Sequence, residues 1–258
     1  MVNKTHYLKT AISLLLIAVF YSPNLRAQSA KNLFENYHKW GITVQYNIFS
    51  AADVTPTNNS NLNYSVLESK LFAFGFEYNF YQYKNWNFKT GIQLQWFGDA
   101  DKLFISQKET VLSLDIDDWS RSNYDLIVYL PITTEYVFLK KGAVNFSLGA
   151  GLALSYYRET FSSRFLDIDN APIFNADTNN NKKPFYTSGH IETSIYFKRK
   201  NFMFQTSFIY NKSYKTYRAG LYEFSNLQVS PNTKGLITQS GDYIGVSITV
   251  YFKKKNKS

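Results

Sequence analysis

Apolar and polar side chains alternate with period two in eight separate segments of the chain. Such alternation is typical of β-strands whose two faces meet different surroundings. The eight segments are Trp40–Phe49, Leu71–Tyr81, Trp86–Phe97, Tyr124–Phe138, Val144–Tyr157, Phe185–Phe197, Phe202–Tyr214 and Tyr243–Phe252. The sequence is therefore predicted to be all-β, with about eight antiparallel strands closed into an up-and-down barrel.

The volume of such a barrel decides which face of each strand points outward. Each segment offers about four or five large apolar side chains, whereas a barrel of about eight strands has an interior that side chains only just fill. The small and polar residues fit that interior, and the large apolar residues do not. The apolar face is therefore expected to contact lipid, which predicts a transmembrane barrel.

The connections between the segments alternate in length. The long ones are Ser50–Lys70, Gly98–Asn123, Arg158–Pro184 and Lys215–Asp242, all rich in polar residues, and Gln82–Asn85, Leu139–Ala143 and Lys198–Asn201 are tight turns. Outer-membrane barrels have short periplasmic turns and longer external loops. We therefore expect extracellular loops and periplasmic chain ends in the outer membrane.

Residues 1–27 have the pattern of a signal peptide. Lys4 and Lys9 precede an apolar run, Ala11–Tyr21, that is shorter than the ~20 residues of a membrane-spanning helix. The expected domains are thus a signal peptide at 1–27 and a barrel at 28–258. A net charge of +9 can indicate nucleic-acid binding, but the predicted export of the chain argues against a nucleic-acid partner. The chain has no cysteine, which excludes disulfides and thiolate metal sites.

Ionisable residues recur on the polar face of the predicted strands. They form an expected lumen network of Glu77, Lys89, Glu135, His190 and Glu192. A turn centred on Tyr83 would set Glu77 directly opposite Lys89, as a close cross-strand ion pair. Buried charges need partners, so the lumen is predicted to be filled.

The tight turns and the last strand end in basic residues. This basic rim is Lys84, Lys140, Lys141, Lys198, Arg199, Lys200, Lys253, Lys254 and Lys255. Aromatic residues expected at the same membrane interface are Trp40, Tyr81, Trp86, Tyr136, Phe197 and Tyr251. The rim is predicted to contact outer-membrane lipids, with a periplasmic protein partner as the alternative.

Two neighbouring strands carry a motif of a known family. Tyr129-Leu130-Pro131-Ile132, followed by Phe146-Ser147-Leu148-Gly149-Ala150-Gly151-Leu152, resembles the PorT-like outer-membrane β-barrel family. The resemblance implies a Gram-negative outer membrane and, for some members, a part in protein secretion. The motif carries no chemistry, so no functional residue follows from it. Inward-facing Gly149 and Gly151 would let the wall curve or admit a neighbour's bulk.

One constellation contains the ingredients of acyl transfer. Ser188, His190 and Glu192 share a strand face, but such neighbours lie ~7 Å apart, too far for a hydrogen-bonded triad. Metal binding is weakly supported as well. His38 and His190 are far apart in strand order, and Asp115, Asp117 and Asp118 lack the spacing of a calcium loop. No catalytic, metal or cofactor site is predicted.

The expected function is that of a non-enzymatic scaffold or accessory subunit of an outer-membrane assembly, with outer-membrane or periplasmic proteins as partners. A narrow pore and a lipid-modifying enzyme are the alternatives.

Overall fold

The fold is a closed barrel of eight antiparallel strands, as the alternation predicts. The computed structural model describes residues 33–112, 115–119, 122–158, 161–179 and 184–255, so the predicted signal peptide lies outside it. The barrel strands are β1 (Tyr37–Phe49), β4 (Ser69–Tyr83), β5 (Trp86–Ile105), β7 (Ser122–Lys141), β8 (Val144–Tyr157), β11 (Phe185–Lys198), β12 (Phe202–Ser213) and β15 (Tyr243–Lys253). Each pairs with its neighbours in that order, and β15 pairs with β1 to close the wall.

The barrel is apolar outside and polar inside. Side chains such as Phe72, Phe76 and Ile132 are 56–61% exposed on the outer wall. Residues on the opposite face of the strands, such as Gln45, Lys89 and Ser194, are buried in the lumen. An exposed apolar band around a polar interior is the arrangement of a transmembrane barrel, because lipid covers the outer wall. No helix in the described ranges is long and apolar enough to cross a membrane.

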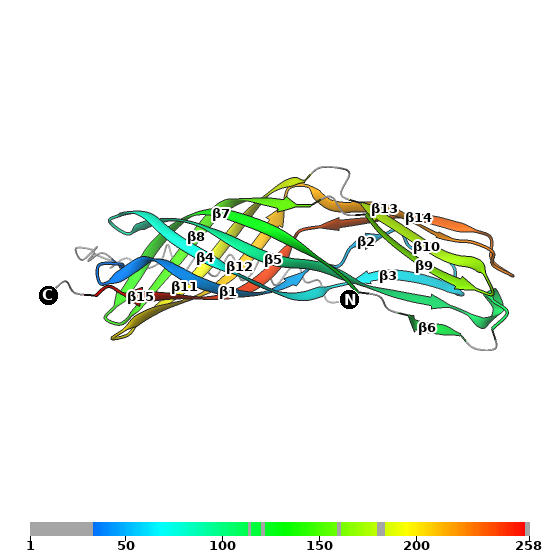
Figure 1. Ribbon diagram of the computed structural model, residues 1–258, viewed down its shortest axis with the longest axis horizontal. Helices are drawn as coiled ribbons and strands as arrows, with labels where there is room; N and C mark the ends of the chain where they lie inside the picture. Colours follow the sequence, from blue (N-terminus) through cyan, green and yellow to red (C-terminus); the bar gives the residue numbers. More distant parts are fainter. Residues whose placement is uncertain (1–32, 113–114, 120–121, 159–160, 180–183, 256–258) are drawn as a thin grey trace, which may run out of the picture.

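The long connections are not irregular loops, which corrects the sequence expectation. They form further strands: β2 (Asp53–Val54), β3 (Leu62–Leu67), β6 (Ile116–Trp119), β9 (Phe161–Ile168), β10 (Ala171–Asn179), β13 (Thr216–Phe224) and β14 (Thr233–Ser240). Strands β2, β14, β13, β10 and β9 make a second sheet, and β3 and β6 pair with the far end of β5. We call this β-structure the cap; it extends the barrel at the end opposite the tight turns (Figure 1).

The cap folds because the connections hide a second apolar core. Leu62, Tyr64 and Val66 alternate along β3 and pack against Phe174 and Tyr222 of the second sheet. Other members of this core are Leu103, Ile105, Ile173, Ala176, Phe224 and Ile237. An ion pair between fully buried Arg164 and Asp101 joins β9 to β5 inside the same core. The hydroxyl of Tyr64 donates to the other oxygen of Asp101 at 2.7 Å.

A buried carboxylate ties the tips of the cap together. Glu109 ends the 3-10 helix η1 (Gln107–Glu109) and is fully buried. It accepts hydrogen bonds from the side-chain amide of Asn61 (2.8 Å), from the backbone N–H groups of Val229 (3.2 Å) and Ser230 (2.9 Å), and from the Ser230 hydroxyl. Burial raises the pKa of Glu109, but these hydrogen bonds outweigh it and hold the pKa below its ordinary value.

The Glu109 contacts should make the cap tips sensitive to acid. An isolated glutamate titrates near pH ~4.3. Because the folded pKa is lower, the stabilisation is fully present above that pH and is lost as the pH falls through the folded value. Glu109→Gln should remove roughly 1–3 kcal/mol of this local stability and its pH dependence. NMR signals of the Val229 and Ser230 amides, followed during acid titration, measure both effects. Glu223→Gln, at a more exposed carboxylate in β13 of the cap, is the control.

Candidate functional site: the barrel lumen and its two ends

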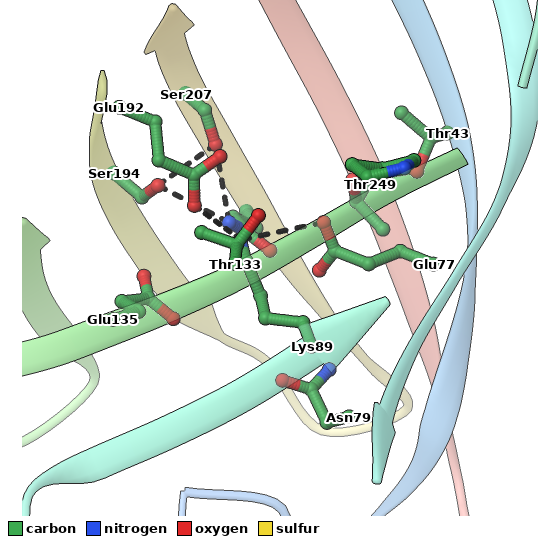
Figure 2. Close-up of polar contacts among 12 residues, drawn as sticks. Thr43, Glu77, Asn79, Lys89, Thr133, Glu135, Glu192, Ser194, Ser207 and Thr249 are labelled. Atoms are coloured by element: carbon green, nitrogen blue, oxygen red, sulfur yellow. Dashed lines mark hydrogen bonds and ion pairs between the residues drawn. The ribbon is translucent and has the colours of Figure 1, made fainter. Parts of the chain in front are cut away.

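Lys89 of β5 is the centre of the lumen network. Its ammonium lies 2.5 Å from Glu192 Oε1 of β11 and 3.3 Å from Glu77 Oε2 of β4, as Figure 2 shows. The Lys89 side chain is 2% exposed. Gln205 of β12 is a further partner of Lys89. With its amide oxygen oriented toward the lysine, it accepts a hydrogen bond from Lys89 Nζ at 2.8 Å. One cation thus connects strands from opposite walls of the barrel.

The pairing of Lys89 with Glu77 forms, but the predicted register is wrong. Lys89 lies opposite Asn79, and Glu77 lies opposite Gly91. The turn follows Tyr83, and the register shifts between Asn79 and Tyr81. The turn lies at Lys84 and Asn85 instead of being centred on Tyr83, which displaces the partners by three positions, and a β-bulge with one extra residue in β4 reduces the displacement to two. The ion pair therefore runs diagonally across the hairpin, and the shortest contact of Lys89 is with Glu192.

Glu135 of β7 lies deeper toward the turn end and is held by hydrogen bonds from neutral donors. The Tyr196 hydroxyl donates at 2.7 Å, the Asn87 amide at 3.2 Å, and the Ser147 hydroxyl also donates. Tyr251 of β15 donates in the same way to Glu77. Donors of this kind stabilise a buried carboxylate without a second cation. The sequence prediction missed these tyrosines, and it placed Tyr251 wrongly in the outer aromatic belt.

His190 and Glu192 fit in the lumen because β8 carries glycines beside them. A Cβ on Gly151 would lie 2.7 Å from His190 Cε1 and 2.2 Å from the Ile132 carbonyl oxygen. A Cβ on Gly149 would lie 3.0 Å from Glu192 Cγ. These glycines thus admit the bulk of the neighbouring strands. His190 Nε2 is then 2.8 Å from the Thr133 hydroxyl.

Gly151→Ala should destabilise the barrel, because the new methyl group meets both His190 and the backbone of β7. Overpacking of this kind costs roughly 1–3 kcal/mol. The expected result is a lower urea midpoint for unfolding from lipid vesicles. Gly142→Ala, whose Cβ would meet nothing within 4 Å but whose φ is +56°, reports the separate cost of backbone strain. A midpoint for Gly151→Ala equal to that of the wild type would contradict the contact.

The acyl-transfer set is not assembled as a triad. His190 bonds to Thr133, and Glu192 bonds to Lys89. The buried hydroxyl of Ser188 has no hydrogen-bond partner within the described part of the chain. Nor do the described residues contain a group of three or more metal-ligating side chains.

An aromatic layer, the mouth cluster, closes the lumen at the loop end. It consists of Phe49, Phe97, Ile127, Tyr157, Tyr186, Ile209, Tyr217 and Tyr243. Arg218 lies over the rings of Phe97 and Tyr157 and pairs with Asp125 of β7. Tyr217 and Arg218 belong to β13, so the cap sheet reaches down into the barrel mouth.

A second apolar layer, the base cluster, closes the turn end. It consists of Leu33, Phe34, Tyr37, Val137, Tyr196, Met203 and Tyr251. Leu33 and Phe34 precede β1, outside the eight predicted strand segments, and both are almost fully buried. Phe34 contacts the ring of Tyr251 edge-on, with ring centroids 5.0 Å apart. Lys254 holds this segment by donating to the carbonyls of Phe34 (3.2 Å) and Glu35 (3.1 Å).

Between the two layers lies a small polar cavity of about 20 Å³. Its lining includes Thr43, Glu77, Thr133, His190 and Glu192. This volume is about that of a single water site. The described side chains therefore leave little free volume at this level of the lumen.

The basic rim lies at the turn end, because every tight connection is there. Lys84 is in the β4–β5 turn, Lys140 and Lys141 end β7, and Lys198 ends β11. Arg199 and Lys200 follow in the β11–β12 turn. Lys253 ends β15, with Lys254 and Lys255 after it. The outward aromatics Trp40, Tyr81, Trp86, Tyr136 and Phe197 are 37–54% exposed on the wall above.

Comparisons with known proteins find likeness only in solved structures. Neisserial surface protein A matches with a TM-score of 0.40 at 11% identity, over 85% of this chain and 100% of that chain. The outer membrane protein OprG from Pseudomonas aeruginosa gives 0.38 at 12%, over 86% and 99%. Ail, the attachment invasion locus protein of Yersinia pestis, gives 0.30 at 13%, over 82% and 97%. No family model and no curated protein matches the sequence, so the PorT-like resemblance stays a prediction.

Proposed function

We propose that the protein is an integral outer-membrane barrel that acts as a non-enzymatic scaffold, or as an accessory subunit of a larger outer-membrane assembly. The observation that carries this proposal is the filled lumen. The mouth cluster, the Lys89 network and the base cluster follow one another along the barrel axis. Such an interior leaves the outer surfaces, and above all the cap, as the parts available to partners.

The cap is suited to presenting a fixed surface. Its strands share an apolar core and are joined to the barrel by the Arg164–Asp101 and Arg218–Asp125 ion pairs. On its outer face Phe161, Phe165 and Leu221 are 58–69% exposed. Exposed apolar side chains on an ordered sheet are a common feature of protein interaction sites. The PorT-like resemblance adds that the assembly could belong to protein secretion.

Purification from native membranes in mild detergent tests the scaffold role. The wild-type protein should copurify with a defined partner, and Phe161→Ser with Phe165→Ser should lose that partner while keeping the heat-modifiable gel migration of a folded barrel. Phe208→Ser, on the lipid-facing wall, is the control, since it removes a ring that is 54% exposed elsewhere on the protein. Recovery of the wild-type protein without any partner, as for the variant, would overturn the proposal.

Two further measurements address the alternatives. In planar lipid bilayers the wild type should show no steady unit conductance, and a reproducible conductance step would favour the pore. Ser188→Ala and His190→Ala should leave the cell's lipid A unchanged in mass spectra. A change caused by both variants would favour the lipid-modifying enzyme.

A further inference from the structure

The charges of the protein are divided unevenly between the two ends of the barrel. Nine lysines and arginines form the basic rim at the turn end, and Glu35 is the one acid in the described segments there. The connections at the loop end carry both signs, including the Lys234–Glu223 and Lys212–Asp242 pairs. The excess positive charge therefore belongs to one membrane surface.

The rim surrounds the barrel instead of forming a patch on one side. The four strand junctions at the turn end are β4–β5, β7–β8, β11–β12 and β15–β1, and each carries at least one basic residue of the rim. These junctions are evenly spaced around the barrel, because every second pair of neighbouring strands is joined at the turn end. A lipid leaflet meets the whole circumference of the barrel, which matches this distribution of the basic residues.

The depth of the rim fits the headgroup region. Exposed Trp86 follows Lys84 by two residues, Phe197 precedes Lys198, and Phe252 precedes Lys253. Amphipathic and aromatic rings favour the membrane interface, so the adjacent ammonium and guanidinium groups lie at the level of lipid phosphates. Lys84, Arg199, Lys200 and Lys253 are all exposed there.

We propose that the basic rim binds the phosphates of anionic phospholipids in the leaflet at the turn end. The ring would collect these lipids around the barrel and fix its depth and orientation. Cations near an anionic membrane surface attract it, and salt weakens that attraction. This inference concerns a different surface from the cap, so it stands or falls separately from the scaffold role.

The test measures which lipids stay bound to the purified barrel. Wild-type protein is folded into nanodiscs of equal phosphatidylglycerol and phosphatidylethanolamine, then analysed by native mass spectrometry. A rim variant carries Lys84, Arg199, Lys200 and Lys253 changed to glutamine. In the control variant the residues changed to glutamine are Lys70, Lys108, Lys215 and Lys234. They are exposed at the loop end, so this variant loses the same amount of positive charge. Heat-modifiable migration shows that each protein is folded.

The wild type and the control variant should retain phosphatidylglycerol in preference to phosphatidylethanolamine. In the rim variant this preference should be about tenfold smaller. The preference of the wild type should also fall in high salt. An unselective wild type, an unchanged rim variant, or an equal loss in the control would each overturn the proposal. Loss of an acidic protein partner by the rim variant, with its lipid selectivity intact, would assign the rim to protein docking instead.

Discussion

Lys89→Met should be among the most destabilising single substitutions in the barrel wall. It leaves Glu77 and Glu192 in the lumen without the ammonium that lies 3.3 and 2.5 Å from them. Removing one partner of a buried ion pair costs roughly 3–5 kcal/mol, because the remaining charge is uncompensated. Urea unfolding from lipid vesicles of one composition measures the loss. Lys212→Met, at a lysine that is 59% exposed, is the control and should cost no more than about 1 kcal/mol.

Double variants divide this cost between the two carboxylates. Adding Glu192→Gln to Lys89→Met should recover more stability than adding Glu77→Gln, because Glu192 is both closer to Lys89 and more deeply buried. Each double-variant cycle gives a coupling free energy, and the geometry predicts a larger one for Lys89 with Glu192 than for Lys89 with Glu77. Additive losses in both cycles would mean that Lys89 meets neither carboxylate in the folded protein.

Arg164→Met should unfold the cap while the barrel stays closed. Arg164 and Asp101 are both fully buried, so the variant leaves a carboxylate inside an apolar core at a cost of roughly 3–5 kcal/mol. The cap core is separate from the lumen, which confines the damage. Chymotrypsin should then cleave near Phe161 and Phe165, which are outside the membrane, and a protected barrel fragment should retain heat-modifiable migration.

The controls for Arg164 use the same sheet and the same core. Lys234→Met breaks an exposed ion pair with Glu223 (3.0 Å) and should leave the cleavage pattern unchanged. Asp101→Asn combined with Arg164→Met should restore part of the protection, since Tyr64 can still donate to the amide oxygen. Equal sensitivity of Arg164→Met and Lys234→Met would contradict a buried pair.

The barrel could be predicted from the sequence because its signal is local. Alternation such as Phe72, Phe74 and Phe76 against Ala73 and Gly75 sets the strand and both of its faces at once. The same signal exists in the cap, where Leu62, Tyr64 and Val66 alternate, but six residues between polar stretches resemble a loop. The short alternating run from Leu62 to Val66 is the feature of the sequence that marks β3.

The contacts of the lumen depended on information that is not local. The register of the β4–β5 hairpin depends on a turn at Lys84 and Asn85 and on the bulge next to Asn79, and no glycine marks either of them. Three glutamates lie on the polar face that also carries Lys89, and the contact with Glu192 forms across the lumen, between strands that are not neighbours. Burial of Leu33 and Phe34 likewise follows from the shape of the barrel base, which the segment itself does not encode.

The short strand β2 gives the cap a particular place in the order of folding. Asp53 and Val54, soon after β1, pair with Thr238 and Ile237, shortly before β15. These two segments are brought together only when β1 and β15 meet, because β2 continues from the first and β14 leads into the second. Before that step, the chain between them is a loop of more than 180 residues whose closure is entropically costly. The complete five-stranded cap sheet therefore forms after barrel closure, and it marks molecules whose insertion is finished.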